Sequence, residues 1–170
     1  MPVGLINLES DYAFNLQYDE AFVFGISIQP VMNTVINGNG HIIDGDYKAA
    51  LFNILNAQFR VTFNNLTFIN VGYSNDMEDC YRNQAPPGTG DVRKIINAVR
   101  IVGSDVMFSN CKFISNKCTM DGAISASSFS KFEVFNSQFL SNNAANGAAI
   151  TMDHSCSVEI YQSDFAQNMA

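Results

Sequence analysis

Two consecutive stretches decide the fold: FISNKCTMDGAISASSFSKFEVFNSQ at residues 113–138 and FLSNNAANGAAITMDHSCSVEIYQSD at residues 139–164. Aligned without a gap, they match at a step of 26 residues, so that Phe113 falls on Phe139 and then on Phe165. The other matches are Asn116 with Asn142 and Asn168, Ile124 with Ile150, Phe132 with Val158, Val134 with Ile160, and Ser137 with Ser163. A fixed period of roughly 20 to 50 residues indicates a repeat architecture.

The same step runs through the N-terminal half of the chain. It carries Val35 to Val61, Asn39 to Asn65, and Ile42 to Phe68. The interval from Phe68 to Phe113 is 45 residues, which is one period of 26 plus 19 further residues. These fall in 71–91, which contains two of the four prolines, so we expect a loop inserted into the repeat.

Each repeat contains short stretches such as RVTF, DVMF, KFEVF and SVEIY, in which apolar and polar residues alternate. This alternation, rich in β-branched and aromatic residues, predicts strands. Strands that recur at one offset, with no helical pattern between them, stack in parallel as successive turns of a coil. We therefore expect one all-β domain over 1–170, a single-stranded parallel β-helix of about five turns, with a cap and the first strands in 1–30. The inward-pointing side chains would be Val61, Phe63, Val106, Phe108, Phe132, Val134, Val158 and Ile160.

Asparagine is unusually frequent, at 20 of 170 residues, and its placement predicts ladders of stacked amides. One offset, directly after a strand, is occupied by Asn39, Asn65, Asn110, Asn136 and Gln162. A stacked amide can hydrogen-bond its own turn and the turns above and below. We expect Asn136→Ala to cost about 1 to 3 kcal/mol, as the loss of a buried hydrogen-bonding group. A second, shorter ladder would contain Asn116, Asn142 and Asn168.

The charge balance excludes two classes of partner. With 9 basic against 16 acidic residues, the net charge is −7, so the chain offers no basic face to neutralise nucleic-acid phosphates and is repelled by anionic lipid. No apolar run approaches the roughly 20 residues that span a bilayer. We expect no nucleic-acid binding and no membrane insertion in this segment. A composition of 47% hydrophobic and 15% charged residues predicts a folded chain.

Two short motifs repeat with the period. Asp121-Gly122-Ala123-Ile124 and Gly147-Ala148-Ala149-Ile150 are each preceded by Phe-x-x-Asn, starting at Phe113 and Phe139. This pattern resembles the paired GGA[I/L/V] and FxxN repeats of polymorphic outer-membrane proteins, although neither copy has the full GGA triplet. The N-terminal half, with VINGNGHIIDG at 35–45, LFNI at 51–54 and VTFNNLTFIN at 61–70, is similar to the adhesin-like surface proteins of methanogenic archaea.

The resemblance spans nearly the whole chain and implies a right-handed parallel β-helix, an extracellular, cell-surface location and a role in adhesion. The partner would be a surface glycan or a protein of another cell, and no cofactor is expected. Such modules are usually one segment of a longer protein, and the last repeat stops partway round a turn, so the chain is expected to be part of one. The favoured function is a non-catalytic binding module. The alternatives are a carbohydrate-active enzyme with a pectin lyase-like fold, either a polysaccharide lyase or a glycoside hydrolase, and a structural spacer or filament subunit.

Enzymes that cleave sugars on this fold need either paired carboxylates on neighbouring turns or an acidic calcium cluster with a basic residue. The nearest candidates are Asp44 with Asp46 and Asp153 with His154, each in a turn. Neither pair has an acidic counterpart one repeat away, so no catalytic residue is expected. His41 has no second ligand at a metal-like spacing, so no metal site is expected.

The four cysteines allow three complete pairings. Cys111 is expected to be a packed core residue. Cys80 lies in the segment that leaves the coil, and Cys118 lies at the matching corner one turn later. We expect a disulfide between Cys80 and Cys118, with Cys156 free, in an oxidising extracellular location.

The inserted segment is the preferred binding element, because long loops on a rigid scaffold concentrate recognition groups. Its candidate binding residues are Tyr73, Asp76, Glu78, Asp79, Tyr81 and Arg82. Aromatic and acidic groups of this kind could contact a sugar or a protein, and the equally weighted alternative is a solvated decoration without a binding role.

Overall fold

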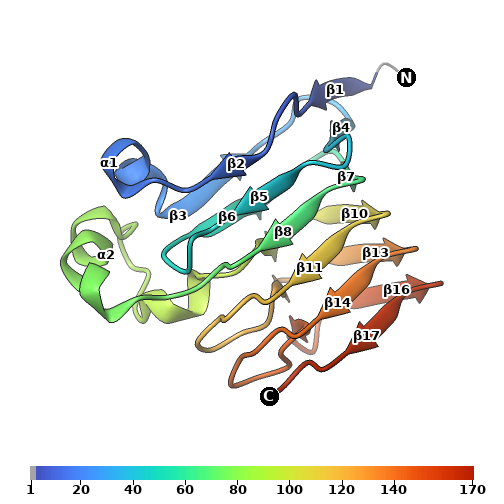
Figure 1. Cartoon of the computed structure of the whole chain (residues 1–170). Helices are drawn as coiled ribbons and strands as arrows, with labels where there is room; N and C mark the ends of the chain where they lie inside the picture. Colours follow the sequence, from blue (N-terminus) through green and yellow to red (C-terminus); the bar gives the residue numbers. More distant parts are fainter. Residues whose placement is uncertain (1–2) are drawn as a thin grey trace.

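The structure is a computed structural model that describes residues 3–170, and it contains three parallel sheets (Figure 1). Sheet A contains, in spatial order, β1 (Gly4–Asn7), β4 (Thr34–Asn37), β7 (Val61–Asn64), β10 (Asp105–Ser109), β13 (Lys131–Phe135) and β16 (Ser157–Tyr161). Sheet B contains β2 (Tyr12–Ala13), β5 (Ile42–Asp44), β8 (Thr67–Ile69), β11 (Lys112–Ile114), β14 (Gln138–Leu140) and β17 (Asp164–Ala166). Sheet C contains β3 (Phe24–Ile28), β6 (Ala50–Leu55), β9 (Val99–Val102), β12 (Ile124–Ser127) and β15 (Ile150–Met152).

Each turn of the coil contributes one strand to each sheet in the order A, B, C. Consecutive strands within a sheet therefore come from consecutive turns, and all the pairings are parallel. The described residues form five complete turns and two strands of a sixth. The expected all-β parallel β-helix of about five turns is confirmed.

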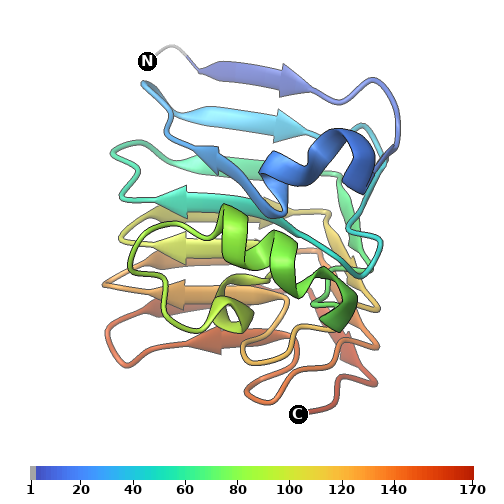
Figure 2. The same cartoon turned by 90° about the vertical axis from the view of Figure 1, so that its left-hand side faces the viewer.

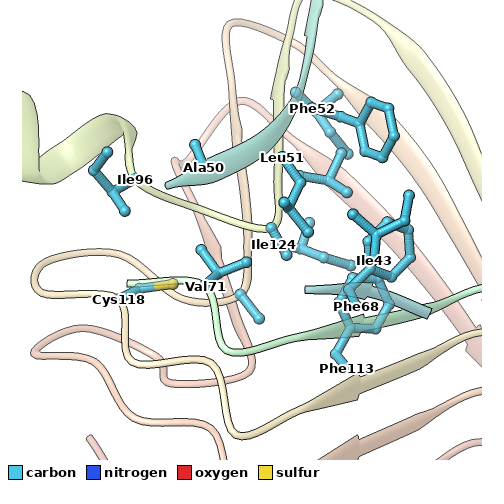
Figure 3. Packing of buried hydrophobic residues seen from close by; sticks show 14 of the residues in the cluster. Ile43, Ala50, Leu51, Phe52, Phe68, Val71, Ile96, Phe113, Cys118 and Ile124 are labelled. Atoms are coloured by element: carbon cyan, nitrogen blue, oxygen red, sulfur yellow. The ribbon is translucent and has the colours of Figure 1, made fainter. Parts of the chain in front are cut away.

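A column of stacked phenylalanine rings marks the repeat inside the coil. Phe113 pairs in register with Phe139, and Phe139 with Phe165. Their ring centroids are 4.6 Å apart at each step, with interplanar angles of 5° and 2°. Phe68 continues the column at 4.7 Å from Phe113, and Figure 3 shows Ile43 above it. Homologous residues of adjacent turns thus lie directly over one another, as the period predicts.

The register of the second turn differs from the expected step of 26. Ile36 pairs with Phe63, a step of 27, and Ile43 pairs with Phe68, a step of 25. The corner between them is two residues longer than in the next turn, because seven positions separate Ile36 from Ile43 whereas five separate Phe63 from Phe68. The alignments of Val35 with Val61 and of Ile42 with Phe68 are therefore each wrong by one residue. Gly40, with a φ of +84°, accommodates the extra length in a backbone conformation that other residues avoid.

The apolar strand residues fill the interior as predicted. Val61, Phe63, Val106, Phe108, Phe132 and Val134 are all fully buried. Val158 is partly exposed and Ile160 is 43% exposed, because both belong to the last turn that the structure describes, and within residues 3–170 no strand packs beyond it. Alternation between inward and outward side chains therefore explains the core.

The inserted segment is helical rather than a loop, which corrects the sequence prediction. In the structure it extends to Ile95, beyond the expected end at residue 91, and contains η2 (Asn75–Met77), α2 (Glu78–Gln84) and η3 (Val92–Ile95). Met77 and Tyr81, four residues apart, are both buried and give the helix one apolar face. Glu78 and Asp79 in the first turn of α2 and Arg82 in its last turn oppose the charges of the helix dipole.

A second helical segment leaves the coil at the same corner, two turns earlier. It contains α1 (Leu16–Asp19) and η1 (Glu20–Phe22), between β2 and β3. Figure 2 shows both segments on one side of the coil, and α2 contacts η1. Residues 3–30 thus contribute one strand to each sheet, and residues 1–2 of the expected cap lie outside the described residues. None of the helices in the described residues is long and apolar enough to cross a membrane.

The five-member ladder is exposed, not buried. Asn39, Asn65, Asn110, Asn136 and Gln162 all have exposed side chains and φ values between 47° and 55°. Asparagine adopts this left-handed conformation more readily than most residues, because its short polar side chain can hydrogen-bond locally. The backbone of the corner therefore explains the repeated amide, and the expectation that Asn136 is a buried hydrogen-bonding group is wrong.

The buried ladder is the shorter one. Asn116 and Asn142 are both fully buried, and Asn168 lies below them. The Asn116 Nδ2 donates to Asn142 Oδ1 at 2.9 Å, and the Asn142 Nδ2 donates to Asn168 Oδ1 at 2.8 Å. Each of the three amides also donates to the carbonyl oxygen of a stacked phenylalanine: Phe68, Phe113 and Phe139, respectively. The ladder therefore joins the amide column to the aromatic column.

Candidate functional site

The inserted segment forms a polar cleft on the surface of the coil. The cleft has a volume of about 630 Å³ and is lined by Tyr73, Asn75, Glu78, Arg82, Gly90, Asp91, Val92, Arg93 and Thr119. This volume falls within the range typical of ligand sites, roughly 300 to 1,000 Å³. Thr119 comes from the corner of the next turn, so the cleft lies between the helical insertion and the coil itself.

One wall of the cleft is an Asp91–Arg93 ion pair at the start of η3. Asp91 caps this helix, because its carboxylate accepts from the backbone N–H of Arg93 at 3.1 Å. The same carboxylate accepts from Arg93 Nε at 2.8 Å and from Arg93 Nη2 at 2.6 Å. The hydrogen bonds and charge of Arg93 lower the pKa of Asp91 to about 2. Asp91 is therefore ionised at neutral pH and cannot serve as a general acid there.

The opposite wall is formed by α2. The Tyr73 hydroxyl donates to the Glu78 carboxylate, and Arg82 Nη2 lies 3.4 Å from Glu78 Oε1, one helical turn later. Glu78 thus has a hydroxyl on one side and a guanidinium on the other. The cleft presents two carboxylates and two guanidiniums in neighbouring pairs, a set that offers both donors and acceptors to a ligand.

Tyr81 is a positioning residue and not a binding residue, which corrects the sequence prediction. Its side chain is fully buried, and its hydroxyl donates to the Lys48 carbonyl at 2.8 Å and accepts from the Ser74 N–H at 3.1 Å. The ring of Tyr73 stacks on Tyr81, with centroids 4.7 Å apart. Tyr81 therefore holds the insertion on the coil and sets the place of Tyr73 in the cleft.

Of the six residues predicted for binding, the structure brings Tyr73, Glu78 and Arg82 together. Asp76 and Asp79 are exposed and do not line the cleft. Asp76 accepts from Ser74 Oγ at 2.5 Å, a hydrogen bond that lowers its pKa. The sequence prediction missed Arg93, which lies two residues beyond the expected end of the insertion. The signal that could have found it is the Asp-x-Arg spacing, in which the aspartate caps a helix and pairs with the arginine.

The acidic residues considered for catalysis make hydrogen bonds or ion pairs that stabilise their own turns. Asp44 accepts from the Asn70 side chain at 3.1 Å and from the Asp46 N–H at 2.8 Å. Asp46 pairs with Lys48 at 2.6 Å. Asp153 accepts from two backbone N–H groups, those of Ser128 and Ser155, which lower its pKa. These carboxylates stabilise tight corners of the coil.

His41 likewise closes a corner, because its Nδ1 lies 3.0 Å from Asp11 Oδ1, which also accepts from the backbone N–H of Ile42. Among residues 3–170, no three His, Cys, Asp or Glu side chains are grouped so as to hold a metal ion.

The expected disulfide between Cys80 and Cys118 is absent, because all four cysteines of the described chain are free. Cys118 is buried beside Val71 inside the corner of the coil (Figure 3). Cys80, on α2, is half-buried, and its burial, together with the charge of Glu20 in η1, raises its pKa. The two sulfurs thus belong to different surroundings, the core for Cys118 and the contact between the helical segments for Cys80. Burial raises the pKa of both the Cys111 and the Cys118 thiol to about 12.

Comparison with known proteins gives no match to a family model, to a curated protein or to a solved structure.

Proposed function

We propose that this chain is a non-catalytic binding module displayed on a cell surface, and that the cleft of the inserted segment binds a surface glycan. The observation that carries this proposal is the pairing of Glu78 with Arg82 and of Asp91 with Arg93 around one cleft. A sugar hydroxyl both donates and accepts hydrogen bonds. A carboxylate beside a guanidinium satisfies both roles at once, and hydrogen bonds to charged groups are the stronger kind.

The rigidity of the cleft supports a recognition role. Its walls are a short helix held by the buried Tyr81 and a capped turn whose carboxylate makes three hydrogen bonds to one arginine. A site that is already ordered loses little conformational entropy when a ligand binds. The extracellular location rests on the resemblance of the repeated FxxN and Gly-Ala motifs to surface proteins.

The test is binding of the labelled protein to a printed array of neutral and acidic oligosaccharides. The double variant Arg82→Ala/Arg93→Ala removes both guanidiniums, which are exposed side chains. Losing hydrogen bonds to charged groups costs about 1.5 to 3 kcal/mol each, so affinity for the bound glycan should fall by about a hundredfold or more. The matched control is Lys94→Ala, which removes an exposed positive charge next to Arg93 but outside the cleft lining.

Equal binding by the double variant and the wild-type protein would refute the proposed site. The non-catalytic part of the proposal is tested separately, by incubating the protein with pectin, alginate and the bound glycan. New reducing ends or unsaturated uronates would show that the chain is an enzyme.

A further inference from the structure

A row of amide side chains crosses the outside of the coil at the corner between sheets A and B, away from the inserted segment. It contains Asn7, Asn37, Asn64, Asn110 and Asn136, joined by four side-chain hydrogen bonds. Each Nδ2 donates to the Oδ1 of the preceding member, at distances from 2.6 to 3.4 Å. All the amides therefore point the same way along the coil axis.

A polar groove with a volume of about 270 Å³ lies beside this row. It is lined by Asn65, Asn110, Cys111, Lys112, Asn136, Ser137, Gln138, Gln162 and Asp164. Amides of the corner form one side, and the outward side chains of β11, β14 and β17 form the other. Because these residues come from consecutive turns, the groove runs parallel to the coil axis.

Much of the hydrogen-bonding capacity in the groove is unused. Within residues 3–170, the side chains of Asn65, Gln138 and Gln162 have no hydrogen-bond partner, and Asn136 uses only one of its two amide hydrogens. Each free amide offers two donors and a carbonyl acceptor. A structural ladder alone needs only the partners above and below, so these side chains are available to a ligand.

The charge of the groove selects against ionic ligands. Lys112 and Asp164 are the only charged residues in the lining, and their charges cancel. The net charge of −7 on the chain disfavours a polyanion at any part of its surface. Phe135 and Tyr161, which pair in register at the position before Asn136 and Gln162, are 38% and 52% exposed and offer apolar faces for a sugar ring.

We propose that this groove binds an extended, uncharged polysaccharide that lies parallel to the coil axis. Successive turns are about 4.8 Å apart. Each sugar of an extended β-1,4-linked chain advances by a similar distance, so successive sugars would lie beside successive turns. The site is separate from the cleft of the inserted segment and does not depend on it.

The test measures binding of neutral hexasaccharides from cellulose, mannan, xylan and chitin by isothermal titration. Hexagalacturonate serves as the charged control. At least one neutral hexamer should bind more tightly than its dimer, and hexagalacturonate should bind more weakly. The double variant Asn136→Gly/Gln138→Ala should reduce the affinity by about tenfold, the effect of roughly one or two lost hydrogen bonds. Glycine at position 136 keeps the left-handed backbone without strain.

Two control variants make the result specific to the groove. Gln58→Ala removes an exposed amide at a different corner, and Lys94→Ala removes an exposed charge that lines neither the groove nor the cleft, so both should leave hexamer binding unchanged. The proposal is overturned if none of the four neutral hexamers binds at millimolar concentration. It is also overturned if the groove variant binds as the wild-type protein does, or if binding is lost with a control variant instead.

Discussion

Replacing Asn142 by Ala should be among the most destabilising single changes outside the apolar core. The Asn142 Oδ1 accepts from Asn116 N at 3.1 Å and from Asn116 Nδ2 at 2.9 Å. The Asn142 Nδ2 donates to the Phe113 carbonyl at 3.0 Å and to Asn168 Oδ1 at 2.8 Å. Alanine would leave the Asn116 N–H and the Phe113 carbonyl inside the coil without these partners.

The magnitude follows from the number of groups left unpaired. An unsatisfied buried donor or acceptor costs about 1 to 3 kcal/mol, so two such backbone groups give about 2 to 6 kcal/mol for Asn142→Ala. The matched control is Asn143→Ala, the same substitution at the next residue, whose side chain is exposed and makes no hydrogen bond within residues 3–170. Surface substitutions of this kind change stability by about 0.5 kcal/mol or less.

The assay is urea unfolding followed by the strand signal in circular dichroism, with equal m-values required for the comparison. A double-mutant cycle with Asn116→Ala should show strong non-additivity, because the two amides share hydrogen bonds. If Asn142→Ala and Asn143→Ala unfold at the same urea concentration, the buried ladder contributes nothing to stability.

Three further predictions concern the packing of the coil and its ionisable groups. Gly122→Ala should destabilise the fold by about 1 to 3 kcal/mol, because a Cβ at Gly122 would lie 2.2 Å from the Gly147 carbonyl oxygen. The measurement is thermal unfolding, and the control is Gly88→Ala, where a Cβ meets no atom within 4 Å but the φ is +76°. This comparison separates a steric clash from the strain of a left-handed backbone. Two thiols, Cys80 and Cys156, should react with Ellman's reagent in the native protein while Cys111 and Cys118 react only on unfolding, and four equally fast thiols would contradict the buried positions. Burial raises the pKa of Tyr81 from 10 to about 12, so its contribution to stability is complete below about pH 10 and is lost as the pH rises towards 12; Tyr81→Phe should show a shallower alkaline loss in urea titrations, and an unchanged slope would exclude this role.

Much of the fold could be predicted because each turn of a solenoid repeats the sequence pattern of the turn before it. The match of Phe113 with Phe139 and Phe165 predicts that these three residues stack, because residues at the same offset in successive turns have the same neighbours. The one-residue errors at Val35 and Ile42 arose where the corner gained two residues and the two flanking strands shifted in opposite senses. The step between repeats alone does not show which of two neighbouring corners contains the additional residues.

The candidate site was harder to predict than the fold. Tyr81 was expected to bind a ligand because aromatic groups on a long loop can contact a sugar or a protein, but the apolar spacing from Met77 to Tyr81 indicates a helix with one buried face. The amides at Asn39 and Asn65 were assigned to a buried ladder because their period is regular. Periodicity reports that a position is equivalent in each turn, and it does not report whether that position faces the core or the solvent.

The side chain of Tyr81 has a mechanical consequence for the N-terminal end of the coil. Its ring lies 5.8 Å from that of Phe24 in the first turn, its hydroxyl binds the Lys48 carbonyl in the second, and its helix is anchored in the third. Each turn of a solenoid contacts only its neighbours, so without further contacts the turns can unfold one at a time under tension or heat. Because Tyr81 joins the first three turns, we expect these turns to unfold together.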